Sequence, residues 1–510
     1  MATAHELTVK NNGRNVLLKF TDADLIVDYG GGIMDDEHSS QCSSVSCFSG
    51  FCRTHNTRLD QVPFRQVIGA YYAKGSLKVS YLTRNHKKNF VLCKCEGAVE
   101  EEHNTFAMDW ADKLMDAAYK GAKQSKTLKV LVNPRGGIGK AKSIFTDQVE
   151  PVFLAAGCTL DITYTEYINH ACEIAQELKL KYDAVVTVSG DGLIHEVLNG
   201  FAQHEQPGKA FAIPIAPIPA GSGNALSLNL LGIEDGLDSL AAALNVLKGH
   251  PMKADLFSFI QNDKRRISFM SQSIGLVADL DIGTDHLRWM GDSRFLYGYL
   301  RGVLSLKTCP VELSFRLVED DKEKMARFAQ ENTGQKPCDP SSSGVDDLEE
   351  LPPLRYLGGT EEGWTTYEKP FIWIYAGKGP YVSRSLMQFP VSLPDDGLID
   401  IAVKEVVSLY SFILLNSCLK MVKDNRAKLL KALDGAEDGV PYWSTTNRYF
   451  KVSAYRIKPL ASKGILAVDG EKFPYTDFQV EVHQRLGTFL SQYGRYMVNF
   501  KVQEPKQVLK

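Results

Sequence analysis

The sequence contains little that would place the chain in a membrane or in a secretory pathway. It has no apolar run of about 18 residues, so we expect no transmembrane helix and only peripheral membrane contact. Residues 1–10 lack the basic-then-apolar pattern of a secretory signal. Ten cysteines among 510 residues are too few for a dense disulfide framework. These absences favour a cytoplasmic chain with reduced thiols.

An excess of charge of one sign is also absent. The formal net charge is -3 at pH 7, which gives no overall attraction to nucleic acid, and we expect no nucleic-acid partner. Apolar residues make up 44% of the chain and charged residues 23%, values typical of a globular protein. A chain of this length can form roughly two to four domains with substantial cores.

The most informative stretch covers residues 184–200. Residues 184–188 form a β-branched apolar run that predicts a buried strand. Small residues on both sides of Asp191 then let the backbone approach a ligand closely, and free N–H groups at the start of the following helix can face an anion. Taken alone, the same pattern fits an ordinary turn in which Asp191 caps a helix.

Two further glycine-rich turns accompany this one. A buried strand is predicted at 128–132 and is followed by a glycine-rich turn at 133–141; residues 217–220 lead into a second such turn at 221–225. Three strand–turn–helix units within about a hundred residues predict a doubly wound α/β domain, with the turns gathered at the carboxyl ends of the strands.

These turns resemble the diacylglycerol-kinase-type catalytic domain, and in detail its sphingosine (long-chain base) kinase branch. The resemblance rests on Asn133-Pro134-Arg135-Gly136-Gly137, Ser189-Gly190-Asp191-Gly192 and Pro219-Ala220-Gly221-Ser222-Gly223-Asn224, and it continues through 275–295, 393–400 and 467–471. It implies a cytoplasmic lipid kinase, peripherally associated with membranes, that uses ATP and Mg²⁺ to phosphorylate the primary hydroxyl of a sphingoid base and so makes sphingosine 1-phosphate.

The resemblance also implies a set of nucleotide contacts. Backbone N–H groups of a glycine turn suit phosphate, the planar fork of arginine offers paired donors, and Mg²⁺ prefers oxygen ligands. Asp469 is in addition the expected magnesium ligand. The expected ATP-binding residues are Asn133, Pro134, Arg135, Thr165, Glu166, Tyr167, Ile168, Asn169, Glu196, Gly221, Ser222, Gly223, Arg288, Arg294, Asp469, Gly470 and Glu471.

The chemistry requires a carboxylate to accept the proton of the attacking hydroxyl, and Asp191 is the candidate. Ser189, Gly190 and Gly192 are expected to border the reacting end of the substrate. The resemblance assigns to Asp281 the binding of the cationic amine of the substrate, which requires an anionic partner. Asp279 and Asp281 would share one face if this segment were extended. Glu196 is a candidate contact for nucleotide or metal-bound water, or alternatively a solvated helix acid.

The expected fold class is α/β plus all-β. We expect a small β-rich domain at 1–100, either pleckstrin-homology-like or a structural extension of the kinase, and a connecting helix at 101–125. A catalytic nucleotide-binding domain is expected at 126–257 and an antiparallel β-sandwich that binds the lipid at 258–510. The acidic composition of 319–368, rich in Ser, Gly and Pro, predicts a flexible insertion.

Three other functions remain open from the sequence. A ceramide or diacylglycerol kinase is disfavoured by Ser189, where such relatives tend to have glycine, and by the Asp279/Asp281 pair. An inactive lipid-binding scaffold is disfavoured by the intact Asp191, Gly223 and Asp469. An NAD kinase shares the Gly-Asp-Gly turn but lacks the later motifs. A homodimer is compatible with the sequence, which does not decide the oligomeric state.

Overall fold

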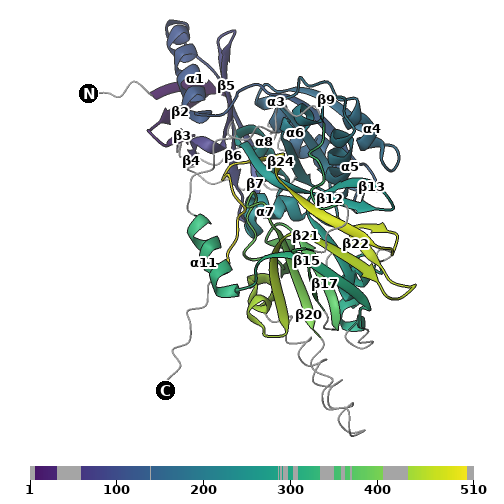
Figure 1. Cartoon of the computed structure of the whole chain (residues 1–510). Coiled ribbons are helices and arrows are strands. Elements are labelled where there is room, and N and C mark those ends of the chain that lie inside the picture. Colours follow the sequence, from purple (N-terminus) through teal and green to yellow (C-terminus); the bar gives the residue numbers. More distant parts are fainter. Residues whose placement is uncertain are drawn as a thin grey trace, which may run out of the picture. The chain divides into compact units, whose positions relative to one another are not determined.

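The computed structural model divides into two compact units (Figure 1). It describes residues 6–30, 59–137, 139–284, 287, 290, 297–302, 308–333, 350–357, 362–367, 370–405 and 435–501. One unit comprises Met1–Thr127, Ser143–Leu160 and Asp238–Gly249; the other comprises Leu128–Lys142, Asp161–Leu237 and His250–Lys510.

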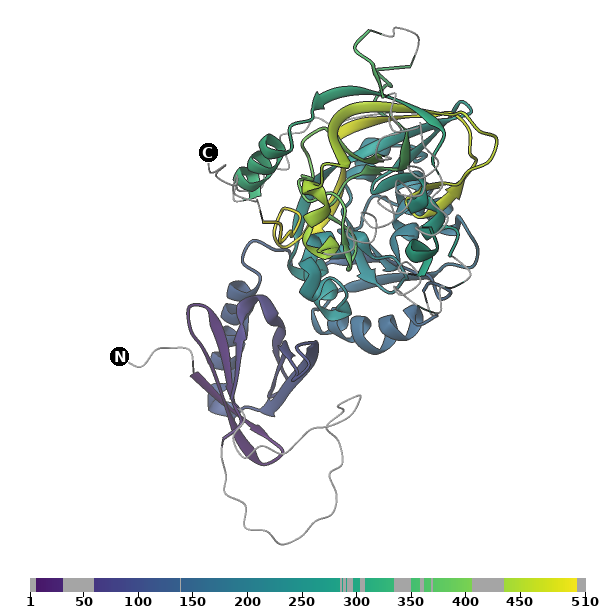
Figure 2. The same ribbon diagram turned by 90° about the horizontal axis from the view of Figure 1, so that it is seen from below.

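The first unit is built on a seven-stranded antiparallel sheet, seen with its own helix in Figure 2. The strands alternate buried apolar and exposed polar residues, the pattern of a sheet with one face on a core. Their order is β4-β3-β2-β1-β7-β6-β5. The bounds are β1 Glu6–Asn11, β2 Arg14–Phe20, β3 Asp24–Asp28, β4 Leu59–Pro63, β5 Val67–Ala73, β6 Ser76–Arg84 and β7 Phe90–Ala98.

Helix α1, Asn104–Ala118, belongs to this unit and closes its core. Trp110 and Leu114 are buried among the strands, and the Trp110 ring lies 5.3 Å from that of Phe20. Phe106, which helical periodicity groups with these residues, is exposed instead. The helix expected as a connector is therefore packed on the sheet. The unit also contains π-helix η3 (Phe145–Val149), α3 (Glu150–Ala155) and α8 (Ser239–Lys248).

The second unit begins with parallel strands in the order β11-β10-β8-β9. Strand β10 pairs in parallel with both β8 and β11, and its six residues are all buried, as expected for a central parallel strand. The bounds are β8 Thr127–Val132, β9 Thr159–Tyr164, β10 Ala184–Ser189 and β11 Ile215–Pro219, with helices α2 Ala141–Ile144, α4 His170–Gln176, α5 Asp191–Ala202, α6 Pro207–Ala212 and α7 Ala225–Asp235.

Antiparallel strands follow and share a large apolar core. Their bounds are β12 His250–Gln261, β13 Lys264–Ser268, β14 Ser271–Gly275, β15 Val311–Glu319, β16 Thr365–Tyr367, β17 Phe371–Gly377, β18 Tyr381–Ser383, β19 Leu386–Met387, β20 Ile399–Glu405, β21 Asn447–Pro459, β22 Leu466–Val468, β23 Glu471–Phe473 and β24 Phe478–Ser491. An α/β part followed by antiparallel β structure is thereby confirmed.

Strand β24 joins the parallel strands of this unit to the antiparallel ones (Figure 1). It pairs in parallel with β11 at Ile215 and Phe489, and it pairs antiparallel with β12 and β21. The parallel and antiparallel strands of this unit therefore form one hydrogen-bonded sheet.

Regular structure extends into the segment for which composition predicts flexibility. Helix α11, Lys322–Thr333, buries Met325 and Ala326, and β16 pairs with β15. The segment 319–368, for which a flexible insertion is expected, therefore contains two elements of regular structure, while residues 334–349, 358–361 and 368 lie outside the described residues. In the part of the chain that the structure describes, no helix has the length and apolar character needed to cross a membrane.

Candidate active site

Glycine-rich turns meet where β10 and β11 end. A Cβ on Gly190 would lie 2.5 Å from the carbonyl oxygen of Gly223, and one on Gly221 would lie 2.3 Å from the Cα of Gly190. Such contacts leave no room for a side chain, so glycine is required here by space. The close approach confirms that these turns gather at one edge of the sheet.

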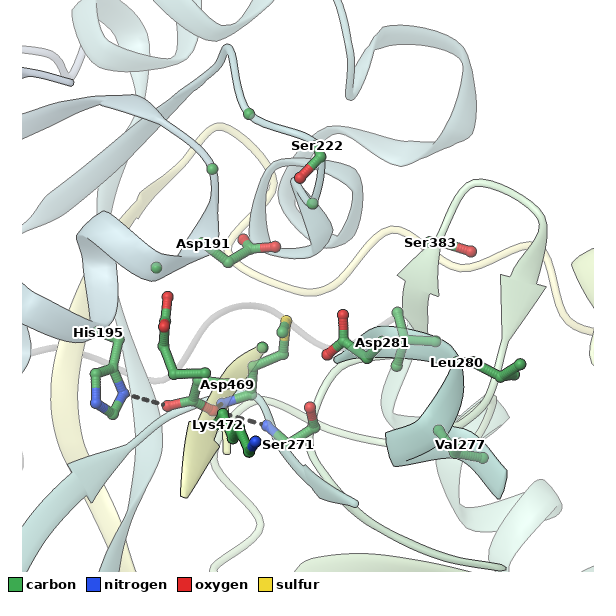
Figure 3. Close-up of a pocket in the computed structure, with 18 of the residues that line it drawn as sticks. Asp191, His195, Ser222, Ser271, Val277, Leu280, Asp281, Ser383, Asp469 and Lys472 are labelled. Carbon is green, nitrogen blue, oxygen red and sulfur yellow. Dashed lines mark hydrogen bonds and ion pairs between the residues drawn. The ribbon is translucent and has the colours of Figure 1, made fainter. Parts of the chain in front are cut away.

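Asp191 is the first residue of α5, and its buried carboxylate lies at the start of another helix (Figure 3). Oδ2 accepts a hydrogen bond of 2.6 Å from the N–H of Ala225, and Oδ1 accepts one of 3.1 Å from Leu226, both in the first turn of α7. Burial raises the pKa of Asp191 to about 6 although these hydrogen bonds oppose the shift, and the charge of Asp469 adds to it. A carboxylate with this pKa can accept a proton near neutral pH.

Asp469 occupies the turn of a hairpin and is held by the protein itself. Val468 pairs with Glu471, so Asp469 and Gly470 form a two-residue loop, with φ of 49° and 82° as in a type I′ turn. Oδ1 accepts hydrogen bonds from the Ser268 hydroxyl and from the N–H groups of residues 270 and 271, at 2.8, 3.0 and 2.9 Å. Oδ2 accepts from the N–H of residue 269 at 3.2 Å.

His195 completes this set of donors. Its Nδ1 lies 2.8 Å from Asp469 Oδ2, and because a carboxylate only accepts, Nδ1 carries the proton. The imidazole lies four residues after Asp191 on α5, so it connects that helix to the hairpin (Figure 3). Both oxygens of Asp469 are thus occupied, and the structure gives no support to Asp469 as the magnesium ligand.

Glu196 and Glu471 are two further carboxylates that line the cavity. Glu196 Oε2 accepts a 3.1 Å hydrogen bond from the N–H of Ala171, at the start of α4. Burial raises the pKa of Glu196, and the negative charge of Glu471 raises it further. A Cβ on Gly192 would lie 2.9 Å from Glu471 Oε1, so Glu471 covers the start of α5. Glu196 and Glu471 therefore lie on and beside helix α5, respectively.

These residues line one cavity of about 1230 Å³. Of the expected nucleotide contacts in the described chain, those that line it are Asn133, Ile168, Asn169, Glu196, Gly221, Ser222, Gly223, Asp469, Gly470 and Glu471. The expected contacts that do not line it are Pro134, Arg135, Thr165, Glu166 and Tyr167. Arg288 and Arg294 lie outside the described residues.

Local contacts engage two of the expected nucleotide-binding groups: Tyr167, which is outside the cavity lining, and the N–H of Gly221, which is within it. The Tyr167 ring stacks on His170 with centroids 4.6 Å apart, and its hydroxyl donates to Glu173 at 2.6 Å, so the side chain is engaged on α4. The N–H of Gly221, expected to bind phosphate, donates to Asn224 Oδ1 at 3.1 Å. That N–H is therefore used within its own turn.

Asp281 lies at the boundary between the polar and apolar parts of the cavity. Asp281 is the last residue of helix α9, Leu276–Asp281, so the condition of an extended segment is not met. The helix separates the two acids: Asp279 is exposed, whereas Asp281 lines the cavity. A Cβ on Gly470 would lie 3.8 Å from Asp281 Oδ2, which places this carboxylate beside the Asp-Gly-Glu turn.

The far wall of the cavity is apolar. Figure 3 shows Val277 and Leu280 on the same helix as Asp281, on the side away from Asp191. Burial raises the pKa of Tyr375. The negative charges of Asp281, Asp191 and Asp469 raise it further, which places Tyr375 close to these acids. The apolar lining residues include Val277, Leu280, Tyr299, Trp373, Val382 and Leu386.

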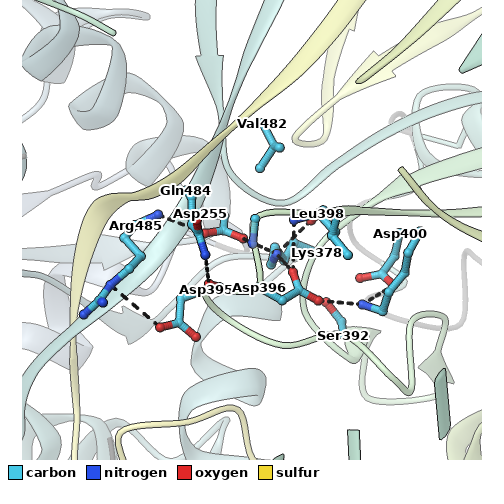
Figure 4. A network of polar contacts seen from close by, with 12 residues as sticks. Asp255, Lys378, Ser392, Asp395, Asp396, Leu398, Asp400, Val482, Gln484 and Arg485 are labelled. Carbon is cyan, nitrogen blue, oxygen red and sulfur yellow. Dashed lines mark hydrogen bonds and ion pairs between the residues drawn. The ribbon is translucent and has the colours of Figure 1, made fainter. Parts of the chain in front are cut away.

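Asp396, an acid of the motif at 393–400, is surrounded by lysine side chains. It lies in a buried network in which Lys378 contacts Asp255 and Asp396, and Lys451 contacts Asp396 and Asp400 at 2.8 and 2.9 Å (Figure 4). Burial disfavours ionisation of Asp396, but the two ammonium groups outweigh it and lower its pKa to about 2. Asp396 does not line the cavity.

Several cavity residues are missed by sequence reasoning. His195 carries a usable signal, since a residue four positions after Asp191 lies on the same helix face. Lys264, Arg266 and Lys472 also line the cavity. Lys264 and Arg266 belong to a charged hairpin, and Lys472 follows the last motif. In the sequence all three therefore resemble ordinary solvent-exposed residues.

Comparisons with known proteins find relatives over most of the chain. Residues 127–259 match the model of the diacylglycerol kinase catalytic domain, and residues 8–120 match a domain of unknown function, DUF7493. The chain is 33% identical over 435 residues to sphingoid long chain base kinase 4 of Schizosaccharomyces pombe, covering 84% of this chain and 88% of that protein. It is 29% identical to human sphingosine kinase 1 over 371 residues, covering 69% and 88%.

Proposed function

Because the chain belongs to the family of sphingoid long-chain base kinases, we propose that it transfers the γ-phosphate of ATP to the primary hydroxyl of a sphingoid base. The observation that carries the substrate assignment is the position of Asp281. Its carboxylate lines the cavity between the Asp191 turn and the apolar wall, so it can pair with an amine while the chain of the lipid lies against apolar side chains. The product is sphingosine 1-phosphate or its analogue.

Asp191 is the proposed general base. The substrate oxygen forms a bond to the γ-phosphorus, the bond from that phosphorus to the β–γ bridging oxygen breaks, and ADP leaves. The hydroxyl proton passes to the Asp191 carboxylate, whose pKa of about 6 suits this transfer. The hydrogen bonds from α7 hold the carboxylate in place during the step. Ser189, Gly190 and Gly192 leave space around the reacting groups.

The nucleotide is proposed to lie along the turns at Asn133, Asn169, Ser222 and Gly223, which line the same cavity. Glu196 and Glu471 offer the oxygen donors that Mg²⁺ prefers, so the residues fit such an ion, whereas Asp469 is committed to protein donors. Neutralisation of phosphate charge is the chemistry that Mg²⁺ supplies when bound. Asp469 itself is proposed to hold the Asp-Gly-Glu turn in register with α5.

Sphingoid bases reside in membranes, so we also propose that the kinase is cytoplasmic and meets its substrate by peripheral contact with a bilayer. Such contact would let a lipid pass into the cavity without crossing water as a free monomer.

The test is transfer of labelled γ-phosphate from Mg·ATP to sphingosine, ceramide and diacylglycerol in mixed micelles. We expect label on sphingosine alone, since only that lipid carries a cationic amine. Asp281→Asn should raise the KM for the base at least tenfold, because it removes the charge that faces the amine. Asp279→Asn is the matched control, as its side chain is on the same helix but exposed. Label on ceramide or diacylglycerol would overturn the substrate assignment.

A further inference from the structure

Most charged groups that line the cavity are acidic. Six carboxylates face it, from Asp191, Glu196, Asp281, Glu437, Asp469 and Glu471. In the described part of the chain the lysine and arginine side chains lining it are those of Lys264, Arg266 and Lys472. An anionic nucleotide cannot lie against carboxylates alone, so the position of these three cations bears directly on where its phosphates bind.

Lys264 and Arg266 share one face of β13. The β12–β13 hairpin closes through Asn262 and Asp263, both with positive φ, and Gln261 pairs with Lys264. Alternation along the strand puts 264 and 266 on one side. Arg265, on the other side, donates to Ser258 Oγ at 2.7 Å and is half-buried. Lys264 and Arg266, the two cations of β13 that line the cavity, therefore lie on the same face of the strand.

Helix α5 holds this strand in place. Asn199 Nδ2 donates to the carbonyl oxygen of Ile267 at 2.8 Å, and the N–H of Ile267 donates back to Asn199 Oδ1 at 2.9 Å. This reciprocal pair attaches the residue next to Arg266 to the helix that begins with Asp191. Arg266 also lowers the pKa of the Cys172 thiol on α4, although burial raises it overall, so the guanidinium lies near the start of α4.

Lys472 comes from the neighbouring hairpin, β22–β23. The two hairpins are tied together because Gln261 Nε2 donates to the carbonyl oxygen of Pro474 at 2.9 Å. The rings of Phe259 and Phe473 pack edge to face with centroids 5.2 Å apart. Figure 3 shows Lys472 beside Asp469 at the cavity. The three cations therefore come from two hairpins that are joined to each other.

None of the three cations forms an ion pair with any residue that the structure describes. We propose that Lys264, Arg266 and Lys472 form a phosphate-binding cluster that contacts the triphosphate of the nucleotide. This assignment rests on the proposed function for the identity of the anion. It places the phosphate chain between the cationic hairpins and the glycine turns.

The experiment measures nucleotide binding directly, in the absence of lipid. The variants are Lys264→Gln, Arg266→Gln and Lys472→Gln in the full chain, with Lys463→Gln as the control, because Lys463 is exposed and does not line the cavity. The probes are Mg·ATP, Mg·ADP and adenosine. We expect Arg266→Gln to raise the Kd for ATP about tenfold, which is the size of one lost charge-assisted contact, and to leave the Kd for adenosine unchanged.

Four outcomes are informative. Weaker ATP binding with unchanged adenosine binding supports the cluster. Unchanged ATP binding in all three variants overturns it, even if the parent phosphorylates sphingosine. An equal loss for ATP and adenosine also overturns it, since that result indicates a distorted site. Loss of ATP binding in the variants combined with no transfer to any lipid by the parent would retain the cluster and reject the proposed function.

Discussion

His195 Nδ1 and Asp469 Oδ2 lie 2.8 Å apart, and this contact joins the helix that carries the Asp191 turn to the hairpin that carries Glu471. The two residues are 274 positions apart in the sequence. Both are buried, so the hydrogen bond is shielded from water and its loss leaves a buried acceptor. The position of the proposed metal-binding Glu471 relative to the proposed base Asp191 depends on this pair.

Replacing His195 tests that dependence. His195→Leu should cost about 1–3 kcal/mol of stability, because Asp469 loses one donor in a buried site. We also expect a higher concentration of Mg²⁺ for half-maximal activity, since Glu471 is on the attached hairpin. The amide nitrogen of His195→Asn can take the place of Nδ1. This variant should therefore restore most of the stability and most of the response to Mg²⁺. Chemical unfolding and magnesium titration of the activity are the measurements; equal effects of both variants would contradict the hydrogen-bond explanation.

The pH dependence of the reaction follows from Asp191. Its pKa is raised to about 6, and it accepts a proton only when ionised. The rate should therefore be low below pH 6, rise as pH passes through 6 and level off above about 7. The measurement is kcat/KM for the lipid at saturating Mg·ATP. In Asp191→Asn the activity should fall by about 10² to 10⁴ and the rise near pH 6 should vanish. A rise that persists in the variant would assign the titration to another group.

The close packing of the glycine turns predicts that a side chain at Gly221 is not tolerated. Gly221→Ala would place a methyl group 2.3 Å from the Cα of Gly190, so the turns must move apart. We expect severe loss of nucleotide binding and activity. Gly223→Ala is the comparison within the same turn, because its Cβ would lie 3.6 Å from Asp191 Oδ2, an ordinary contact. If both alanine variants bind Mg·ATP like the parent, the turns do not depend on this close approach.

Lys378 should be important for folding rather than for catalysis. It is 2% exposed and lies between Asp255 and Asp396, and although burial opposes its charge, these carboxylates raise its pKa. Lys378→Met would leave buried carboxylates without their counter-ion and should cost about 3–5 kcal/mol. Urea unfolding measures this cost, with the exposed Lys463→Met as control. A loss below about 1 kcal/mol would show that the network reorganises or admits water.

Local sequence patterns account for the architecture of the nucleotide-binding part. The apolar run at 184–188 and the small residues around Asp191 were sufficient to predict a strand, a turn and a helix, and the structure has all three. The same reasoning predicted the neighbouring turns at 133 and 221 because each strand and turn lies within one short segment.

Features formed by distant segments could not be read in this way. Asp469 was expected at the metal from the family resemblance of its motif, but its hydrogen-bond donors come from Ser268–Ser271 and from His195, about 200 and 270 residues earlier. Asp191 accepts from α7, which a local reading does not reveal. Residues 278–281 were short enough to fit a strand or a helix, and the surrounding packing, with Leu276 and Ala278 buried, selects the helix.

The pairing of β24 with β11, β12 and β21 has a mechanical consequence. A rigid-body separation of the nucleotide turns from the strands around the apolar wall would have to break backbone hydrogen bonds in a buried ladder. We therefore expect no interdomain hinge in the catalytic cycle. The spacing between the phosphate donor and the lipid headgroup is then set by covalent geometry and strand register, so the tolerance of the enzyme for longer or shorter headgroups should be small.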